Sequence, residues 1–221
     1  MPRIIDLTLP VVPDDRGVNR DIATTIERDG WNATTWHLYS HSGTHMDAPV
    51  HFAAGPGTID QIPLAGCCGP AWVADLRPCA PRALLTPGNL GTLRDEFPAG
   101  ESLLLHTGWS RHRDDRAVYR DGLPRLSEAL ATWCVAHRVK LLGVEPPSVA
   151  DVNNLAEVTH IHEILLRGGV TIVEGLCHLD QLAAPRVWFG AFPLKLAGSD
   201  GSPVRAFALE GIDPDAFTPN P

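Results

Sequence analysis

A short segment, HSGTHMDAPVHF, places three histidines and an aspartate within eleven residues and so restricts how the chain can fold. These candidate ligands are His41, His45, Asp47 and His51. Because even numbers of residues separate them, their side chains would project from the same side of an extended backbone. Full extension would place the ends roughly 33 Å apart, too far for one ion. The segment must therefore fold back on itself, and Gly43 and Pro49 are placed to permit a turn.

The combination of imidazole and carboxylate groups indicates a transition-metal site. Zinc, manganese and iron favour this donor set, whereas calcium and magnesium favour mostly oxygen ligands. A single tetrahedral zinc needs three protein ligands and a water, so four candidates leave one side chain to act as acid or base. The alternative is that these are surface or capping histidines, since a lone histidine is more often structural than a ligand. The number of candidates in one segment favours the metal site.

A second group of candidate ligands lies downstream and includes His162 and Glu174. Apolar residues at helical spacing predict a helix over 156–169, with two glycines as its stop. If the chain reverses at the glycines, a returning strand carries Glu174 back alongside His162. His160 and Glu163 are competitors that spacing alone does not eliminate, and a glutamate at a strand end is often simply solvated.

Runs of apolar residues predict many strands and few helices over the whole chain. Strands are expected at 3–9, at the start of 34–52, and at 71–76, 102–109, 140–144, 170–176, 187–196 and 201–211. Helices are expected at 126–138 and 156–169. The sequence GSDGSP predicts a hairpin-like turn between the last two strands. We therefore predict one mixed α/β domain over 1–221, with a barrel-like or sandwiched β-sheet and flanking helices.

The charge balance argues against a nucleic-acid partner. The chain has 18 basic and 26 acidic residues, a net charge of −8 with neutral histidines, and no run rich in lysine or arginine. Proteins that bind nucleic acid concentrate positive charge on one face or along one element. We expect no nucleic acid among the partners of this chain.

Cysteine usage and the first residues favour a cytoplasmic location. The five cysteines are odd in number, and the adjacent Cys67 and Cys68 are too strained for an ordinary disulfide. The opening sequence MPRIIDLTLP lacks the basic start and unbroken apolar stretch of a signal peptide. No later window approaches the roughly 20 apolar residues of a membrane span. We expect a reducing compartment and no membrane partner.

The segment 41–51 fits the pattern H-x-G-T-H-x-D-x-P-x-H, and through it the chain resembles the cyclase family of metal-dependent hydrolases. This family includes bacterial kynurenine formamidase and isatin hydrolase. The resemblance covers most of the chain, because further landmarks follow in the family's order. They are IPLAGCCGPAWVADL, LLLHTGWS, LLGVEPPSVAD, HEILLRGGVTIVEGLCHLDQL and FPLKLAGSDGSPVRAFAL.

The resemblance assigns a role to each residue of the two groups. It implies a first metal site of His41, His45 and Asp47. It further implies that Asp47 and Glu174 are carboxylates shared between two metals, and that His162 completes the second site. One or two divalent ions per chain are expected, with zinc, manganese and iron as candidates. His51 matches the family's proton donor and acceptor, which accounts for the spare imidazole.

These roles imply hydrolysis of a small amide, either an aryl formamide or a cyclic lactam, with a small molecule as substrate. The metal would activate a water and polarise the carbonyl, and His51 would carry a proton to the departing nitrogen. The alternatives are a lactone hydrolase, a biosynthetic cyclase or dehydratase on the same site, and a non-catalytic metal- or ligand-binding protein. The resemblance also implies a homo-oligomer, either a dimer or a tetramer, and a fold of swivelling β/β/α type.

Several other residues are weaker candidates for the site. Glu145 stands where the family usually has aspartate, and either Glu145 or Asp151 could support the ligands or simply form a turn. Ser42 and Thr44 are expected to orient ligands or satisfy the turn rather than act as nucleophiles. One or two of the larger aromatic side chains are expected to reach the substrate, among Trp36, Phe52, Trp109, Trp188 and Phe189.

Overall fold

Seven strands close into a barrel-like ring in the structure, a computed structural model that describes residues 1–13 and 15–217. The strands around the ring are β12 (Gly201–Glu210), β11 (Arg186–Pro193), β5 (Cys68–Asp75), β7 (Ser102–His106), β9 (Leu141–Val144), β10 (Thr171–Glu174) and β4 (His45–Asp47). The ring closes because β12 also pairs with β4. An eighth strand, β1 (Arg3–Asp6), pairs with the later part of β12. The predicted mixed α/β class with a barrel-like sheet is confirmed.

The ring combines parallel and antiparallel strands. Strands β5, β7, β9 and β10 run parallel to one another, whereas β4, β11 and β12 join through antiparallel pairings. The parallel strands are nearly continuous apolar runs because they are buried on both faces. Leu103 and Leu105 of β7 pack into one core cluster, while Leu104 between them packs into the other. Successive side chains of a strand point to opposite faces of the sheet, so one strand contributes residues to both core clusters.

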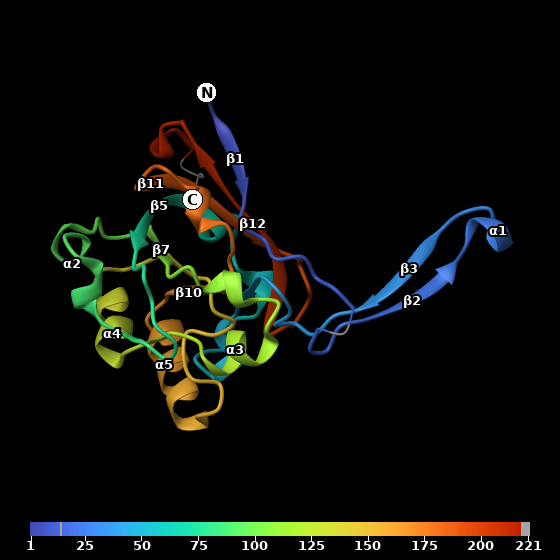
Figure 1. The fold of residues 1–221 in the computed structure, drawn as a ribbon, viewed down its shortest axis with the longest axis horizontal. Coiled ribbons are helices and arrows are strands. Elements are labelled where there is room, and N and C mark those ends of the chain that lie inside the picture. The colour runs from blue at the N-terminus through green and yellow to red at the C-terminus, as the bar shows by residue number, and fades with distance from the viewer. Residues whose placement is uncertain (14, 218–221) are drawn as a thin grey trace.

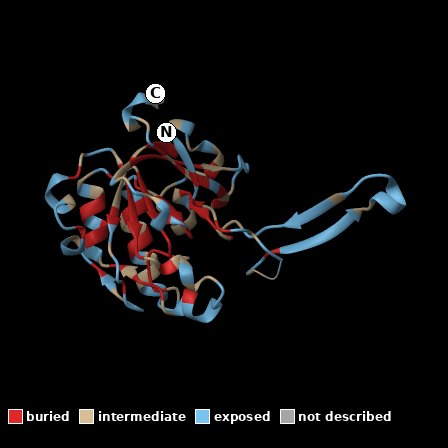
Figure 2. Cartoon of the chain, turned by 45° about the horizontal axis from the view of Figure 1, so that its top comes forward, coloured by how far each residue is buried: buried red, intermediate tan, exposed pale blue. Residues whose placement is uncertain are grey.

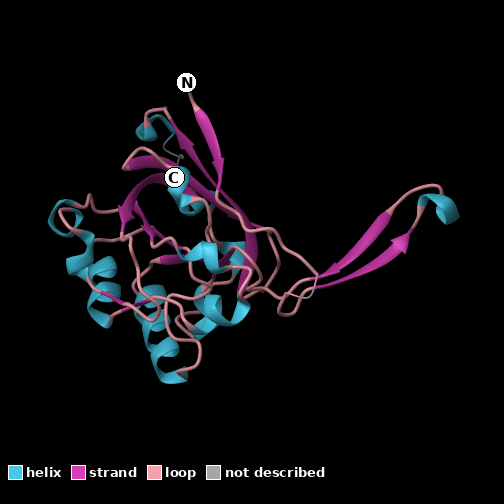
Figure 3. Ribbon diagram, viewed as in Figure 1, coloured by secondary structure: helices cyan, strands magenta, loops and turns pink. Residues whose placement is uncertain are grey.

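Helices α4 (Glu128–Ala136) and α5 (Leu155–Arg167) pack against one side of the sheet. The other α-helices are α1 (Ile26–Asp29), α2 (Leu93–Glu96) and α3 (Arg116–Asp121). Figure 3 shows α2, α4 and α5 grouped away from the extended hairpin. The buried faces of α4 and α5 join the cluster of Leu103 and Leu105 through Leu130 and Leu165. The two helices begin at Ser127 and Asn154, whose side chains accept hydrogen bonds from the first turn of each helix.

Short elements connect the main ones. A two-stranded sheet pairs β6 (Leu84–Leu85) with β8 (Arg125–Leu126). Single turns of 3₁₀-helix occur at η1 (Pro49–Phe52), η2 (Ile59–Gln61), η3 (Leu64–Cys67), η4 (Pro87–Leu90), η5 (Trp109–His112), η6 (Leu179–Gln181) and η7 (Pro214–Phe217). In the described part of the chain, no helix combines the length and apolar character needed to cross a membrane.

A long hairpin projects from the body of the molecule. It consists of β2 (Asn19–Thr24), α1 at its tip and β3 (Ala33–His37). Figure 1 shows it extending to the right of the ring, and Figure 2 shows that its residues are mostly exposed. The sequence predicted the start of a strand near residue 34 but left 10–33 unassigned. The return strand β2 was missed because its sequence, NRDIAT, has only one large apolar residue.

Candidate metal centre

Strand pairing places the candidate ligands on one face of the sheet. In the antiparallel pair of β10 and β4, Glu174 lies directly opposite His45. Directly paired residues point to the same side, and Asp47, two residues beyond His45, shares that side. The second histidine comes from α5, whose buried face carries His162 against the end of β10. The predicted reversal at the glycines therefore brings His162 and Glu174 together.

The side chains of the two predicted groups meet in one buried cluster. His45 Nε2 lies 3.2 Å from Glu174 Oε2 and 3.8 Å from Asp47 Oδ1. His162 Nε2 lies 3.4 Å from Glu174 Oε1 and 3.6 Å from Asp47 Oδ2. His41 Nδ1 lies 2.9 Å from Asp47 Oδ1. Asp47 thus stands between His41 and His45 on one side and His162 with Glu174 on the other.

Backbone carbonyls fix the orientation of two of the imidazoles. His45 Nδ1 lies 3.0 Å from the carbonyl oxygen of Gly43, and His162 Nδ1 lies 2.6 Å from that of Val158. A carbonyl oxygen only accepts hydrogen bonds, so each Nδ1 carries the proton in the neutral ring. The lone pair of each Nε2 then points into the cluster, as is usual for histidines that bind a metal.

The cluster has the charge and donor atoms that a divalent cation requires. Asp47 Oδ2 is buried and has no hydrogen-bond partner in the described structure. Imidazole nitrogens and carboxylate oxygens together suit a borderline transition metal. Three overlapping sets of atoms in the described residues could each hold an ion: His41, His45 and Asp47; Asp47, His162 and Glu174; and the less buried His41, His51 and Asp200. The first two are the sets that the family resemblance implies.

The electrostatics of the cluster also favour bound positive charge. Burial favours neutral imidazole, but the hydrogen bonds and charge of Glu174 outweigh it and raise the pKa of both His45 and His162. The pKa of His41 is likewise raised, against burial, by Asp47 and Asp200. Burial alone would raise the pKa of Glu174, yet the two imidazoles hold it far below its usual range. The carboxylates therefore favour positive charge in the cluster, either as protons on the imidazole rings or as a bound cation that replaces those protons.

His51 lies beside the cluster rather than within its buried centre. It sits on η1 and stacks on His41, with ring centroids 3.8 Å apart. Burial lowers the pKa of His51, so the ring is largely neutral near pH 7. The ring lines the cavity described below. This position leaves one imidazole facing the cavity.

Asp200 also lies beside the cluster, although the sequence did not identify it. Its Oδ2 lies 3.2 Å from His41 Nε2 and 3.5 Å from His51 Nδ1. It stands in the predicted turn before β12, and pairing of Gly201 with Asp47 brings that turn to the cluster. The turn was predicted, but nothing in the sequence showed that β12 closes the ring against β4.

The competing candidates lie elsewhere. The exposed His160 is 3.2 Å from Glu128, and Glu163 binds Arg167 at 2.8 Å. Glu145 is buried but accepts hydrogen bonds from the loop at 107–110. These contacts place it under a loop rather than among the ligands.

Three of the weaker candidates form an ion pair or hydrogen bonds with groups outside the cluster. Asp151 pairs with Arg82. Ser42 donates to the carbonyl of Tyr39, and Thr44 donates to that of Gly175. None of these contacts reaches the cluster of ligands.

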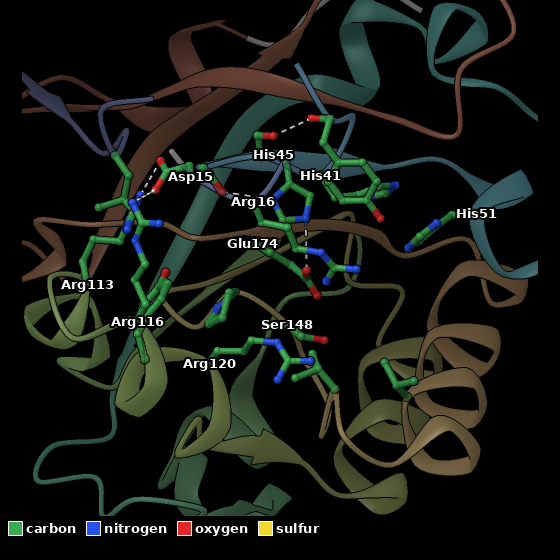
Figure 4. Close-up of a pocket in the computed structure, with 18 of the residues that line it drawn as sticks. Asp15, Arg16, His41, His45, His51, Arg113, Arg116, Arg120, Ser148 and Glu174 are labelled. Carbon is green, nitrogen blue, oxygen red and sulfur yellow. Dashed lines mark hydrogen bonds and ion pairs between the residues drawn. The ribbon is translucent and has the colours of Figure 1, made fainter. Parts of the chain in front are cut away.

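A cavity of about 390 Å³ opens beside the cluster, and Figure 4 shows most of the residues that line it. His41, His45, His51, His162 and Glu174 all border it. Among the aromatic candidates, Phe52 borders the cavity and stacks on His162 at 4.2 Å between centroids. Phe189 is buried in the same core cluster as Leu104, Trp109 is buried in a third, smaller cluster, and Trp36 lies on the hairpin. Tyr39, which the sequence did not single out, also lines the cavity.

Comparison with known proteins identifies the family. The Cyclase family model matches residues 5–151. The kynurenine formamidase of Salinibacter ruber is 31% identical over 83% of this chain and 82% of its own length. That of Geobacillus thermodenitrificans is 31% identical over 91% of this chain and 92% of its own. Isatin hydrolase A from Labrenzia aggregata superposes with a TM-score of 0.85 at 24% identity, covering 94% and 93% of the two chains. The chain belongs to the cyclase family.

Proposed function

We propose that the protein is a metal-dependent hydrolase of small amides. The observation that carries this proposal is the convergence of three histidines and two carboxylates in one buried cluster. All of these residues except Asp47 border a cavity that a fourth histidine, His51, also lines. The names of its relatives, kynurenine formamidase and isatin hydrolase, support the same reaction class. An aryl formamide or a cyclic lactam is the kind of substrate that this comparison suggests.

Five residues are proposed to hold one or two divalent ions. His41, His45 and Asp47 would form one site, and Asp47, His162 and Glu174 would form the other. When bound, the metal supplies an activated water and polarises the carbonyl group of the substrate. Zinc is our first candidate because histidine and carboxylate ligands with an open position suit it, with manganese and iron as the alternatives.

His51 is proposed as the acid and base of the reaction. Its ring is neutral near pH 7, because burial lowers its pKa, and can accept a proton as water adds to the carbonyl carbon. The same ring then donates that proton to the nitrogen of the breaking C–N bond, so the nitrogen leaves as a neutral amine. Stacking on His41 and the nearby Asp200 carboxylate hold the ring in place.

The position of His51 also bears on the non-catalytic alternative. A structural metal site is usually closed by its protein ligands, whereas a catalytic site keeps an open position. Here an additional imidazole borders the cavity beside the candidate ligands. This arrangement favours an enzyme over a metal-binding protein without turnover.

The test combines metal analysis with hydrolysis assays. Protein purified without added metal is analysed for metal per chain and assayed with formanilide and isatin, before and after chelation. We expect one or two ions per chain and turnover that chelation abolishes and metal restores. His51→Ala should retain the metal and lower kcat by about 100-fold or more. Absence of metal after reconstitution, or full activity in His51→Ala, would overturn the proposal.

A further inference from the structure

Part of the cavity wall is strongly basic. Outside the metal cluster, the charged side chains among its described lining residues are four arginines and one aspartate: Arg16, Arg113, Arg116, Arg120 and Asp15. Figure 4 shows Arg113, Arg116 and Arg120 projecting from the segment that contains α3, facing the histidines across the cavity. A chain of net charge −8 therefore concentrates positive charge at this one wall.

The carboxylate of Asp15 neutralises part of this positive charge. This carboxylate lies 2.5 Å from Arg113 and 3.2 Å from Arg116, and the Asp15 side chain is only 9% exposed. One carboxylate thus holds two guanidinium groups in position. It neutralises a single charge and fixes the geometry of the wall.

The other two arginines keep hydrogen-bond donors for a ligand. Arg16 lies over the ring of Tyr39, 5.5 Å from its centroid, and no carboxylate in the described part of the chain pairs with it. Arg120 uses Nη1 to reach Asn153, at 2.9 Å, and Asp121. Its Nη2 and Nε make no hydrogen bond to the described residues, so two N–H groups on one edge of the guanidinium remain available.

We propose that the substrate carries a carboxylate in addition to the amide, and that Arg16 and Arg120 bind it. This inference rests on the proposed function, because it assumes that the amide lies at the metal cluster. Guanidinium groups bind carboxylates through two parallel hydrogen bonds, which are stronger than bonds between neutral groups. With the amide carbonyl at the histidines, a carboxylate elsewhere on the same small molecule would face the basic wall. The natural substrate is then an anionic amide rather than a neutral one.

Matched substrates test this specificity. Hydrolysis of 3-formamidobenzoate and formanilide is compared, since the two differ only by the carboxylate. We expect wild-type protein to favour the anion in kcat/KM by about tenfold or more, mainly through KM. Arg16→Gln and Arg120→Gln should each lower kcat/KM for 3-formamidobenzoate by a much larger factor than kcat/KM for formanilide, so that the preference for the anion is lost. The control, Arg94→Gln, removes an exposed arginine that lies outside the cavity and should keep the preference.

A binding experiment separates this inference from the proposed reaction. Calorimetry with 3-acetylbenzoate and acetophenone uses ketones that cannot be hydrolysed and again differ only by the carboxylate. Tighter binding of the anion to wild-type protein, lost in Arg16→Gln and Arg120→Gln but kept in Arg94→Gln, would support the inference. Equal binding of both ketones, or an anion preference that survives both substitutions, would overturn it. These outcomes hold even if neither formamide is hydrolysed, a result that would count against the proposed function alone.

Discussion

Glu174 and His45 face each other across the antiparallel pair of β10 and β4, with Oε2 3.2 Å from Nε2. The register of two short strands therefore determines the distance between candidate ligands that lie far apart in the sequence. A shift of one residue would turn every side chain of β4 to the opposite face. The hydrophobic alternation that buries Met46 in the core is thus also what directs its neighbours, His45 and Asp47, into the candidate metal centre.

Glu174→Gln tests the role of this carboxylate. The amide has nearly the same shape but no charge, so it binds a divalent cation much less well. We expect less metal per chain by elemental analysis and a fall in kcat of about 100-fold or more. Glu163→Gln, on the outer face of α5, is the matched control and should behave as wild type. Unchanged metal content in Glu174→Gln would show that Glu174 is not a ligand.

Removal of metal should also lower thermal stability. Asp47 and Glu174 are buried, and a cation that binds only the folded state stabilises it by mass action. A metal present at 100 times its Kd contributes about 2.7 kcal/mol, which corresponds to roughly 5–10 °C in Tm for a chain of this size. Calorimetric scans before and after chelation measure this change, and added zinc should reverse it. An identical Tm for the two forms would argue against a metal in the buried cluster.

The sequence could point to most of the candidate ligands because their spacing and chemistry are local properties. His41, His45, Asp47 and His51 lie in one segment whose turn residues were recognisable. One predicted helix and one reversal brought Glu174 back to the helix that carries His162, whereas the choice of His162 over His160 came from the family resemblance. Asp200 was missed because its place depends on the pairing of β12 with β4, a contact between distant segments. The basic wall was missed for a similar reason. Arg16 precedes the hairpin, whereas Arg120 lies on α3, and only the folded chain brings both to one cavity.

The sequence left two roles open for Glu145, namely support of the candidate ligands or formation of a turn. The contacts in the structure favour the second role, and a substitution tests it. The buried carboxylate of Glu145 accepts hydrogen bonds from the N–H of Thr107 at 2.7 Å and the hydroxyl of Ser110 at 2.7 Å. Glu145→Gln places an amide N–H₂ where donors already point, so we expect a loss of about 2–4 kcal/mol of unfolding free energy. Urea denaturation measures this loss, and Glu128→Gln at an exposed site is the control. The metal content of Glu145→Gln should equal that of the wild type. A variant that loses metal but keeps its stability would instead show that Glu145 supports the candidate ligands.

A homo-oligomer remains a prediction, and we expect it to depend on the hairpin of β2 and β3. A two-stranded hairpin is marginally stable alone in water, yet this one projects from the body with Ile22 66% and Trp31 59% exposed. A second copy of the chain could cover both side chains. Light scattering after size-exclusion chromatography should therefore give a multiple of the single-chain mass, and Ile22→Thr with Trp31→Gln should shift it toward one chain. Leu155→Gln, which changes an exposed apolar residue on α5, should leave the mass unchanged. A wild-type protein that elutes with the mass of one chain would contradict the prediction.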